Sequence, residues 1–323
     1  MKPIISMNNP FIQMKQISFI FLLLVFGCQS RQGSQDESHS ETTPKESNEM
    51  VTIVTEVMDF AGPDSIPSGW TTFQFINNSE DTHFMVLEKL PEGKTLEDSK
   101  NEIVPLFTEA MDLINAGNAE EGFKVFEKLP EWFFEVVFSG GPGLIAPFSV
   151  SETTLFMEPG YYVMECYLKM PQGQFHSAMG MIDSIVVTDS PNENEKPEAT
   201  HSITLSSEKG IVREDSLTAG KHTIAVYFED QIGHENFVGH DLHLVKIEDN
   251  ADIAVLEKWM DWTDPDAFKS PIPEGFRFMG GTQEMPANQT AYFNVTLIPG
   301  TYAFIAEVPR ASEKNMLSVF TIE

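Results

Sequence analysis

The segment TTLFMEPGYYVMEC at residues 153–166 has a counterpart later in the chain, FNVTLIPGTYAFIA at residues 293–306. In both segments a Pro-Gly turn separates two runs of apolar, β-branched and aromatic residues, which is typical of β-strands. Before each segment come, in the same order, a histidine with Lys and an apolar residue six and seven residues later, and then a Gly-Gly pair. These are His83 and Gly140-Gly141 in the first block, and His240 and Gly280-Gly281 in the second. Because these landmarks recur in one order, they indicate an internal duplication.

Most other segments are also predicted to be strands. Residues 70–77 alternate between two sets of side chains and end in a turn-forming Asn-Asn-Ser sequence. A polar stretch at residues 189–200 (DSPNENEKPEAT) then divides the chain into two blocks of ordinary domain size. We therefore expect an all-β protein with two tandem β-sandwich domains, residues 51–190 and residues 201–323.

The first block contains an insert with a different period. Four apolar residues follow helical i, i+3, i+4, i+7 spacing: Phe107, Ala110, Met111 and Ile114. Gly117 can end that helix, and Asn118 with Glu121 three residues later is typical of the start of another. The pattern predicts a helical hairpin over residues 105–129 that packs against the first sandwich.

The N-terminus has the features of an export signal. Residues 1–27 carry two lysines, no acidic residue and an apolar run over residues 17–26. That run is about half of the ~20 residues a helix needs to span a bilayer, so it predicts a cleaved segment. Val25-Phe26-Gly27-Cys28 resembles the lipobox of bacterial lipoproteins, which implies cleavage before Cys28 and lipidation of its sulfur. An ordinary secretory signal with a chance cysteine is the alternative, and Met14 is an alternative start to Met1.

Composition limits the partners of the exported chain. Residues 28–50 begin with the lipidated cysteine, have almost no apolar residue and are expected to form a disordered tether. Loss of the two lysines of residues 1–27 lowers the net charge from −29 to −31. Such a surface repels phosphate backbones, so nucleic acid is excluded, and a basic redox or envelope protein is the expected partner.

Cysteine content leaves Cys166 in an unusual position. The chain has two cysteines, and lipidation of Cys28 leaves Cys166 without a disulfide partner. In an oxidising envelope a lone thiol is open to oxidation unless it is buried or bound to a metal as a thiolate. Both explanations are compatible with the residue pattern.

The residues around Cys166 form an ordered series. His83 follows a strand that ends in a polar turn, and a Gly-x-Tyr-x-x-x-Cys strand ends at Cys166. The loop after Cys166 returns His176 and then Met181. Over most of residues 51–188 this order resembles the cupredoxin family of blue copper proteins. The resemblance implies Greek-key sandwiches, and it implies that His83, Cys166, His176 and Met181 bind one copper ion per chain.

The donor types suit that ion, because soft sulfur stabilises Cu(I) and imidazole serves both oxidation states. The nine residues between Cys166 and His176 exceed the short loop of plastocyanin-like proteins, although copper nitrite reductases have a comparably long one. Met179 competes with Met181 for the axial position. The alternative is a fold that retains ligand-like residues without metal, with His83 as a core histidine.

The second block lacks most of this series. Alignment of the Pro-Gly turns places Ala306 opposite Cys166 and Met316 opposite Met181, and residues 309–315 contain no histidine. Two other groups could bind ions: the H-x5-H-x2-H series His234, His240 and His243, and the carboxylates Asp261, Asp264 and Asp266. Solvated side chains are the simpler explanation for both, because the aspartates lack the glycine and glutamate of an EF-hand loop.

We therefore expect an envelope lipoprotein that binds copper for electron transfer or copper handling. The alternative is a copper-free interaction protein that binds a partner through its acidic surface and helical insert. No catalytic motif is found, and an enzyme is not expected. Gln29 resembles the sorting residue of enteric outer-membrane lipoproteins, which favours the outer membrane, facing the periplasm or the cell surface.

Substitution of the expected lipidation site tests the anchor. Cys28→Ser should abolish incorporation of a labelled fatty acid and leave unlipidated precursor, because no other exported cysteine lies at a cleavage motif. Labelling that persists in the variant would disprove the anchor.

Overall fold

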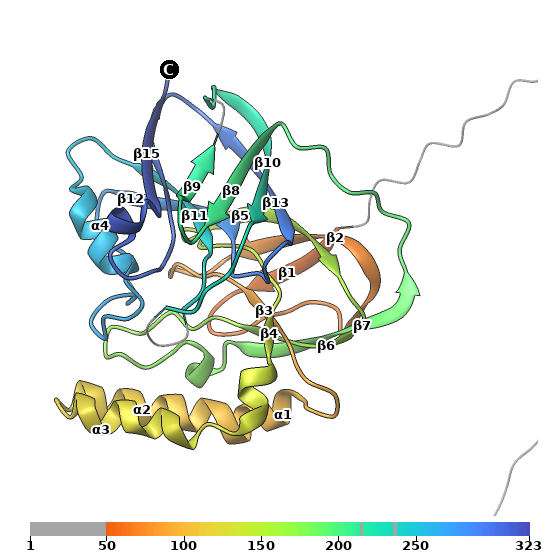
Figure 1. Ribbon diagram of the computed structural model, residues 1–323, viewed down its shortest axis with the longest axis vertical. Helices are drawn as coiled ribbons and strands as arrows, with labels where there is room; N and C mark the ends of the chain where they lie inside the picture. The colour runs from red at the N-terminus through yellow and green to blue at the C-terminus, as the bar shows by residue number, and fades with distance from the viewer. Residues whose placement is uncertain (1–49, 214–215, 235–237) are drawn as a thin grey trace, which may run out of the picture. The chain divides into compact units, whose positions relative to one another are not determined.

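The computed structural model describes residues 50–213, 216–234 and 238–323, which form one compact unit (Figure 1). The expected signal peptide, Cys28 and nearly all of the tether lie outside the described residues. The described part is mainly β, with two sheets and a helical insert, in agreement with the sequence. Within it, no helix has both the length and the apolar composition that a membrane crossing requires.

The strands of the first half are β1 (Val51–Thr55), β2 (Ser65–Asn77), β3 (Val86–Lys89), β4 (Val137–Phe138), β5 (Ser149–Met157), β6 (Gly160–Glu165) and β7 (Ile182–Pro191). Those of the second half are β8 (His201–Ser206), β9 (Gly210–Arg213), β10 (Gly220–Phe228), β11 (Leu242–Ile247), β12 (Phe276–Thr282), β13 (Thr290–Leu297), β14 (Gly300–Ile305) and β15 (Leu317–Ile322). Residues 192–199, between β7 and β8, have no regular structure. The division into two domains remains a prediction.

Strand β2 pairs with different strands along its two parts. Its first residues pair in parallel with β7, its register shifts between Pro67 and Ser68, and from Gly69 onward it pairs antiparallel with β5. A strand that bends in this way can pass from one sheet of a sandwich to the other. The alternation predicted for residues 70–77 is confirmed, since Thr71, Phe73 and Phe75 are buried while their neighbours are only half-buried.

The two halves share one of the sheets. Strand β5 of the first half pairs with β13 of the second through Tyr292–Thr154, Phe293–Thr153 and Asn294–Glu152. Hydrogen-bonded neighbours then follow the order β4-β3-β6-β7-β2-β5-β13-β10-β8-β9, with β1 on β2. The other sheet, β12-β11-β14-β15, comes from the second half alone. In separate halves, β5 and β13 would each be an exposed edge strand. Their pairing covers both edges.

The helical insert is present and begins earlier than predicted. It consists of α1 (Leu96–Asp98), a π-helical turn (Ser99–Ile103), α2 (Val104–Asn115), α3 (Ala119–Val125) and a 3-10 turn (Phe126–Lys128). Thr95 and Asp98 form a capping box at its start, in which the Thr95 amide donates to the Asp98 carboxylate at 2.8 Å. Helices α2 and α3 run side by side beneath the sheets in Figure 1.

Equivalent pairings in the two halves support the internal duplication. Lys89 of β3 lies opposite Tyr162 of β6, and Lys246 of β11 lies opposite Tyr302 of β14. The second glycine of each Gly-Gly pair has a positive φ, +139° at Gly141 and +132° at Gly281. Few residues other than glycine adopt such angles, so the paired glycines reflect one backbone path used twice.

Gly141 offers a direct test of this path. A Cβ atom there would overlap the carbonyl oxygen of Met85, so Gly141→Ala must move backbone as well as adopt an unfavourable φ. Gly93 also has a positive φ, +84°, but has open space around it. Gly93→Ala should cost about 1–2 kcal/mol of unfolding free energy, and Gly141→Ala clearly more, in urea titrations. Equal losses would show that the close approach at Gly141 does not constrain the fold.

Candidate metal centre

Three segments bring the predicted ligands together. His83 lies in the stretch after β2, where its amide and carbonyl bond with Ile145 at 3.2 and 2.8 Å. The buried Asn77 side chain supports that stretch by donating to the carbonyls of Asp81 and Ala146. These bonds explain why a polar turn precedes the histidine, because Asn side chains readily bind nearby backbone groups.

The loop after β6 folds back on the strand end. The His176 amide donates to the Leu168 carbonyl at 2.8 Å, and the Ser177 amide donates to the Cys166 carbonyl at 3.0 Å. The Cys166 amide in turn donates to the Met181 carbonyl at 3.2 Å. The long loop that separates Cys166 from His176 is therefore held by its own backbone, and its two ends meet at the cysteine.

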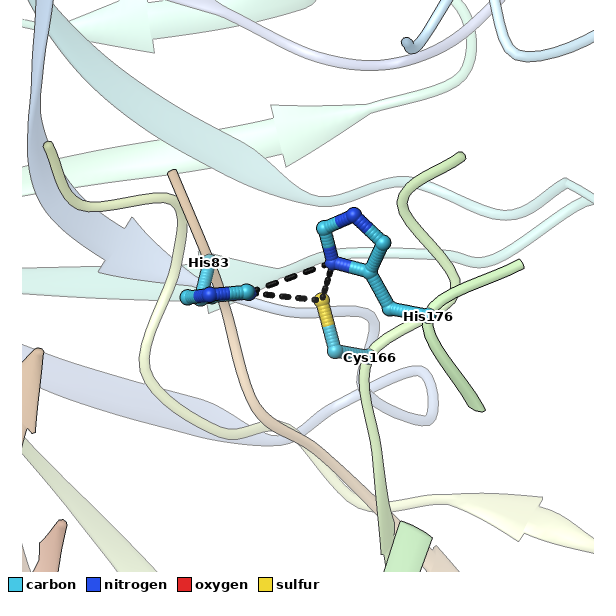
Figure 2. Close-up of side chains that lie close together, drawn as sticks. All are labelled: His83, Cys166 and His176. Atoms are coloured by element: carbon cyan, nitrogen blue, oxygen red, sulfur yellow. Dashed lines mark hydrogen bonds between the residues drawn. The ribbon is translucent and has the colours of Figure 1, made fainter. Parts of the chain in front are cut away.

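The donor atoms of His83, Cys166 and His176 form a small triangle (Figure 2). The sulfur of Cys166 lies 3.9 Å from Nδ1 of His83 and 3.7 Å from Nδ1 of His176, and the two Nδ1 atoms are 3.2 Å apart. All three side chains are completely buried. Figure 2 shows the two rings and the sulfur directed at one another from separate segments.

This triangle fits a bound ion. Nitrogen and sulfur ligands at bond lengths of about 2.0–2.3 Å lie roughly 3.5–3.8 Å apart in a trigonal arrangement, close to the distances found. Two imidazoles and a thiolate, with a methionine nearby, are the donor set typical of a type-1 copper site. The described residues thus contain a cluster with the composition that the sequence led us to expect, and its dimensions suit a bound ion.

Burial distinguishes the two methionines that the sequence left as candidates, Met179 and Met181. The side chain of Met181 is completely buried, whereas that of Met179 is 52% exposed. The Met181 backbone is also bonded at both its amide and its carbonyl to the ligand segment, through His176 and Cys166. Met181 is therefore the methionine that belongs to the buried cluster.

Burial also sets the charge of the cluster. Desolvation lowers the pKa of His83 to about 3, with the neighbouring His176 adding to the effect, and lowers the pKa of His176 to about 4. It raises the pKa of the Cys166 thiol to about 12. At neutral pH the three groups are then two neutral imidazoles and a thiol. A cation that binds them finds two imidazoles that are already neutral, and it must displace the proton of the Cys166 thiol.

The second half of the chain covers the cluster. Oγ of Ser270 lies 3.4 Å from Nε2 of His176, and the Lys169 amide donates to the Phe268 carbonyl at 2.9 Å. The ring of Phe268 packs 6.1 Å from that of Phe84, next to His83. Sequence patterns did not reveal this cover, because neither Phe268 nor Ser270 belongs to a motif.

The corresponding place in the second half lacks two of the four donors, the cysteine and the loop histidine. The amides of Ala306 and Met316 donate to the carbonyls of Met316 and Ala311, as those of Cys166 and Met181 donate to Met181 and His176. Ala306 and Ala311 therefore occupy the cysteine and loop-histidine positions. The first of these correspondences was predicted, and the structure adds the second.

The two other groups suggested by the sequence are not metal clusters. Nε2 of His234 lies 3.1 Å from Nε2 of His240, but His243 bonds elsewhere, to Asp241 and to the Leu144 amide. His240 and His243 are also completely buried, so the expectation of solvated side chains is wrong for these two residues, and they form no surface metal cluster with His234. Asp261 and Asp264 instead accept hydrogen bonds within local turns, from Thr263 and from Asp266.

Sequence patterns missed a group of carboxylates beside the centre. Asp241, His243 and Glu307 are buried, with potential donor atoms within 4.8 Å of one another. Tyr167, the residue after Cys166, donates from its hydroxyl to Glu307. Burial raises the pKa of Glu307, and the charges of Asp241 and Glu284 raise it further. These residues are far apart in the chain, so no local motif could predict them.

No known family model and no curated protein sequence matches the chain. Among solved structures, it is similar to the auracyanin of Roseiflexus castenholzii, at 22% identity and a TM-score of 0.26 over 43% of this chain and 96% of that one. Auracyanin A, a blue copper protein of Chloroflexus aurantiacus, matches at 18% identity and a TM-score of 0.27, over 43% of this chain and 98% of that one.

A longer alignment relates the chain to the copper nitrite reductase of Nitrosomonas europaea. It covers 85% of this chain and 93% of that one, at 14% identity and a TM-score of 0.23. At these scores the superpositions identify no residue of the site. The chemistry of the cluster follows from its own geometry.

Glu284 provides a test of the electrostatics. Burial raises its pKa to about 8, from 4.5 in the unfolded chain, so the folded chain keeps a proton that the unfolded chain releases between these values. Stability from this group is therefore complete below 4.5 and is lost as the pH rises toward 8. Glu284→Gln should remove that loss, so its stability relative to wild type should rise by up to about 1.4 kcal/mol per pH unit across this window.

Urea unfolding of the metal-free chain at about pH 5 and about pH 8 measures the difference. Glu92→Gln, at an exposed position, is the control and should show no such trend. A Glu284→Gln variant with the same pH profile as wild type would contradict the assigned burial.

Proposed function

We propose that the chain binds one copper ion through His83, Cys166 and His176, with Met181 as a weak axial ligand, and uses it to transfer electrons. The observation that carries this proposal is the buried triangle of one sulfur and two imidazole nitrogens. Bound copper would supply a one-electron couple between Cu(I) and Cu(II). The protein supplies the donors and their fixed positions.

Each part of the site has a role in that couple. The backbone bonds of Ser177 and Met181 to Cys166 hold the sulfur and the loop in place when the charge changes. Burial excludes water, so no solvent ligand competes with the thiolate. The Ser270 hydroxyl near Nε2 of His176 can orient that ring and fix its tautomer.

Complete burial favours electron transfer over copper delivery. A protein that hands an ion to an acceptor needs a ligand exposed to that acceptor, and here each of the three ligand side chains is covered. Residues of the second half, among them Phe268 and Ser270, would have to move before the ion could leave. An electron needs no such opening.

We further propose that each half is a Greek-key sandwich of the cupredoxin type, the second a copy without metal. The shared pairings of the halves and the alanines at positions 306 and 311 support this interpretation. Electron transfer by a single copper site does not require a catalytic site, and we propose none. A lipid on Cys28 would hold the chain at the outer membrane, and the net charge of −31 that remains after loss of residues 1–27 suits a basic redox or envelope partner.

Copper loading of the full chain tests the site, because the second half covers it. Wild type should retain about one copper and show intense visible absorption from the thiolate-copper bond. Cys166→Ser should lose both, since a serine hydroxyl is hard and stays protonated. Met181→Leu should retain copper with a higher reduction potential.

Met179→Leu is the matched control, because Met179 is exposed, and it should change neither stoichiometry nor spectrum. Equal copper in wild type and Cys166→Ser would mean adventitious binding only, and would favour the copper-free interaction protein.

A further inference from the structure

A cavity lies between the helical insert and the two halves of the chain. It contains about 870 Å³ of space not filled by atoms, a volume that includes space open to solvent. Aromatic rings form much of its wall, including those of Phe107, Trp132, Phe175 and Trp262. The helical insert therefore does more than cover the sandwich, since it closes one side of an enclosed space.

The charged groups of the wall have one sign. Four carboxylates line the cavity, those of Glu88, Glu165, Glu284 and Glu307, and its described lining contains no Lys, Arg or His. Asp241 stands directly behind Glu307, whose amide donates to it at 2.9 Å. The ammonium of Lys169 donates to the carbonyls of Asp264 and Pro265. That of Lys94 lies 4.7 Å from the ring centroid of Trp132 and pairs with Asp98 and Glu102 of the insert. These carboxyl groups thus face one another without a bound counterion, so burial and their mutual repulsion raise the pKa of Glu307 and of Glu284, and a bound cation would favour their ionised forms.

Glu307 has an unsatisfied atom in this wall. Its side chain is only 4% exposed, and one oxygen accepts a hydrogen bond from the Tyr167 hydroxyl. The other oxygen, Oε2, is buried without a partner, and so is Nε1 of Trp262 on the same wall. An ionised Oε2 lacks a donor and a protonated one lacks an acceptor, so either state leaves a bond that a ligand could make.

A metal ion is a poorer occupant than an organic cation. In the Asp241, His243 and Glu307 group, Nδ1 of His243 accepts from the Leu144 amide at 3.0 Å. The proton of the neutral ring is then on Nε2, which donates it to Asp241, so no nitrogen of His243 is free for a metal. Aromatic walls also add nothing to metal coordination, whereas they attract organic cations and bury an apolar body.

We propose that this cavity binds a small organic cation, a protonated amine carried on an aromatic or other apolar body. The ammonium group donates to Glu307, beside Glu284 on the same wall, and the apolar body lies against the aromatic wall. Glu165 and Tyr167, which flank Cys166 in sequence, both line the cavity, so an occupant lies next to the metal centre. This binding would occur with or without copper, and it is a second activity besides electron transfer.

Calorimetric titration of the copper-free full chain with 2-phenylethylamine at neutral pH tests the proposal. We expect saturable binding of one molecule, accompanied by a change in tryptophan fluorescence because Trp132 and Trp262 line the cavity. The neutral analogue 2-phenylethanol has nearly the same shape and should bind at least about tenfold more weakly, since it lacks the charge-assisted bond. Glu307→Gln should weaken amine binding by about tenfold or more.

Glu158→Gln, at an exposed site outside the cavity, is the matched control and should bind as wild type does. If Glu307→Gln does not fold, Glu284→Gln replaces it. Equal affinity for the amine and the alcohol, no saturable binding of the amine, or unchanged affinity in a folded variant would overturn the proposal. Stoichiometric Zn²⁺ binding that is lost in Glu307→Gln, with no amine binding, would overturn it in favour of a metal. Because copper is absent, none of these outcomes depends on the metal centre.

Discussion

The mutual approach of three buried donors, one sulfur and two imidazole nitrogens, is the constraint on which the rest of the structure depends. Bringing them together requires the end of β6, the loop after it and the stretch after β2 to meet at one point. Backbone bonds within the loop and the turn anchored by Asn77 hold these segments in place. A core without an ion would be better served by apolar side chains, because buried polar groups need partners to offset their lost hydration.

The second half of the chain completes the burial of the cluster. The second half repeats the strand pairings of the first but carries Ala306 and Ala311 where the first carries Cys166 and His176. It contributes Ser270 and its neighbours as a cover over the buried cluster. Strands β5 and β13 join the halves in one sheet, so the cover is part of the fold and not a separate module.

Sequence patterns predicted the parts of the structure that depend on local order. Alternation identified β2, the helical period identified α2, and the order of residues identified the members of the cluster. The capping box at Thr95 and Asp98 was a signal of an earlier helix start that the apolar period alone did not include. The β5–β13 joint and the Asp241–Glu307 contact could not be predicted, because they depend on pairings between segments far apart in the chain.

X-ray absorption at the copper edge of the Cu(II)-loaded full chain tests the central claim most directly, since it reports the ligand atoms themselves. The structure predicts one short copper–sulfur bond and two imidazole nitrogens, the atoms contributed by Cys166, His83 and His176. A first shell made only of oxygen and nitrogen would contradict it. The ion would then be bound at carboxylates such as Asp241 and Glu307, and the triangle of Figure 2 would not be the metal centre.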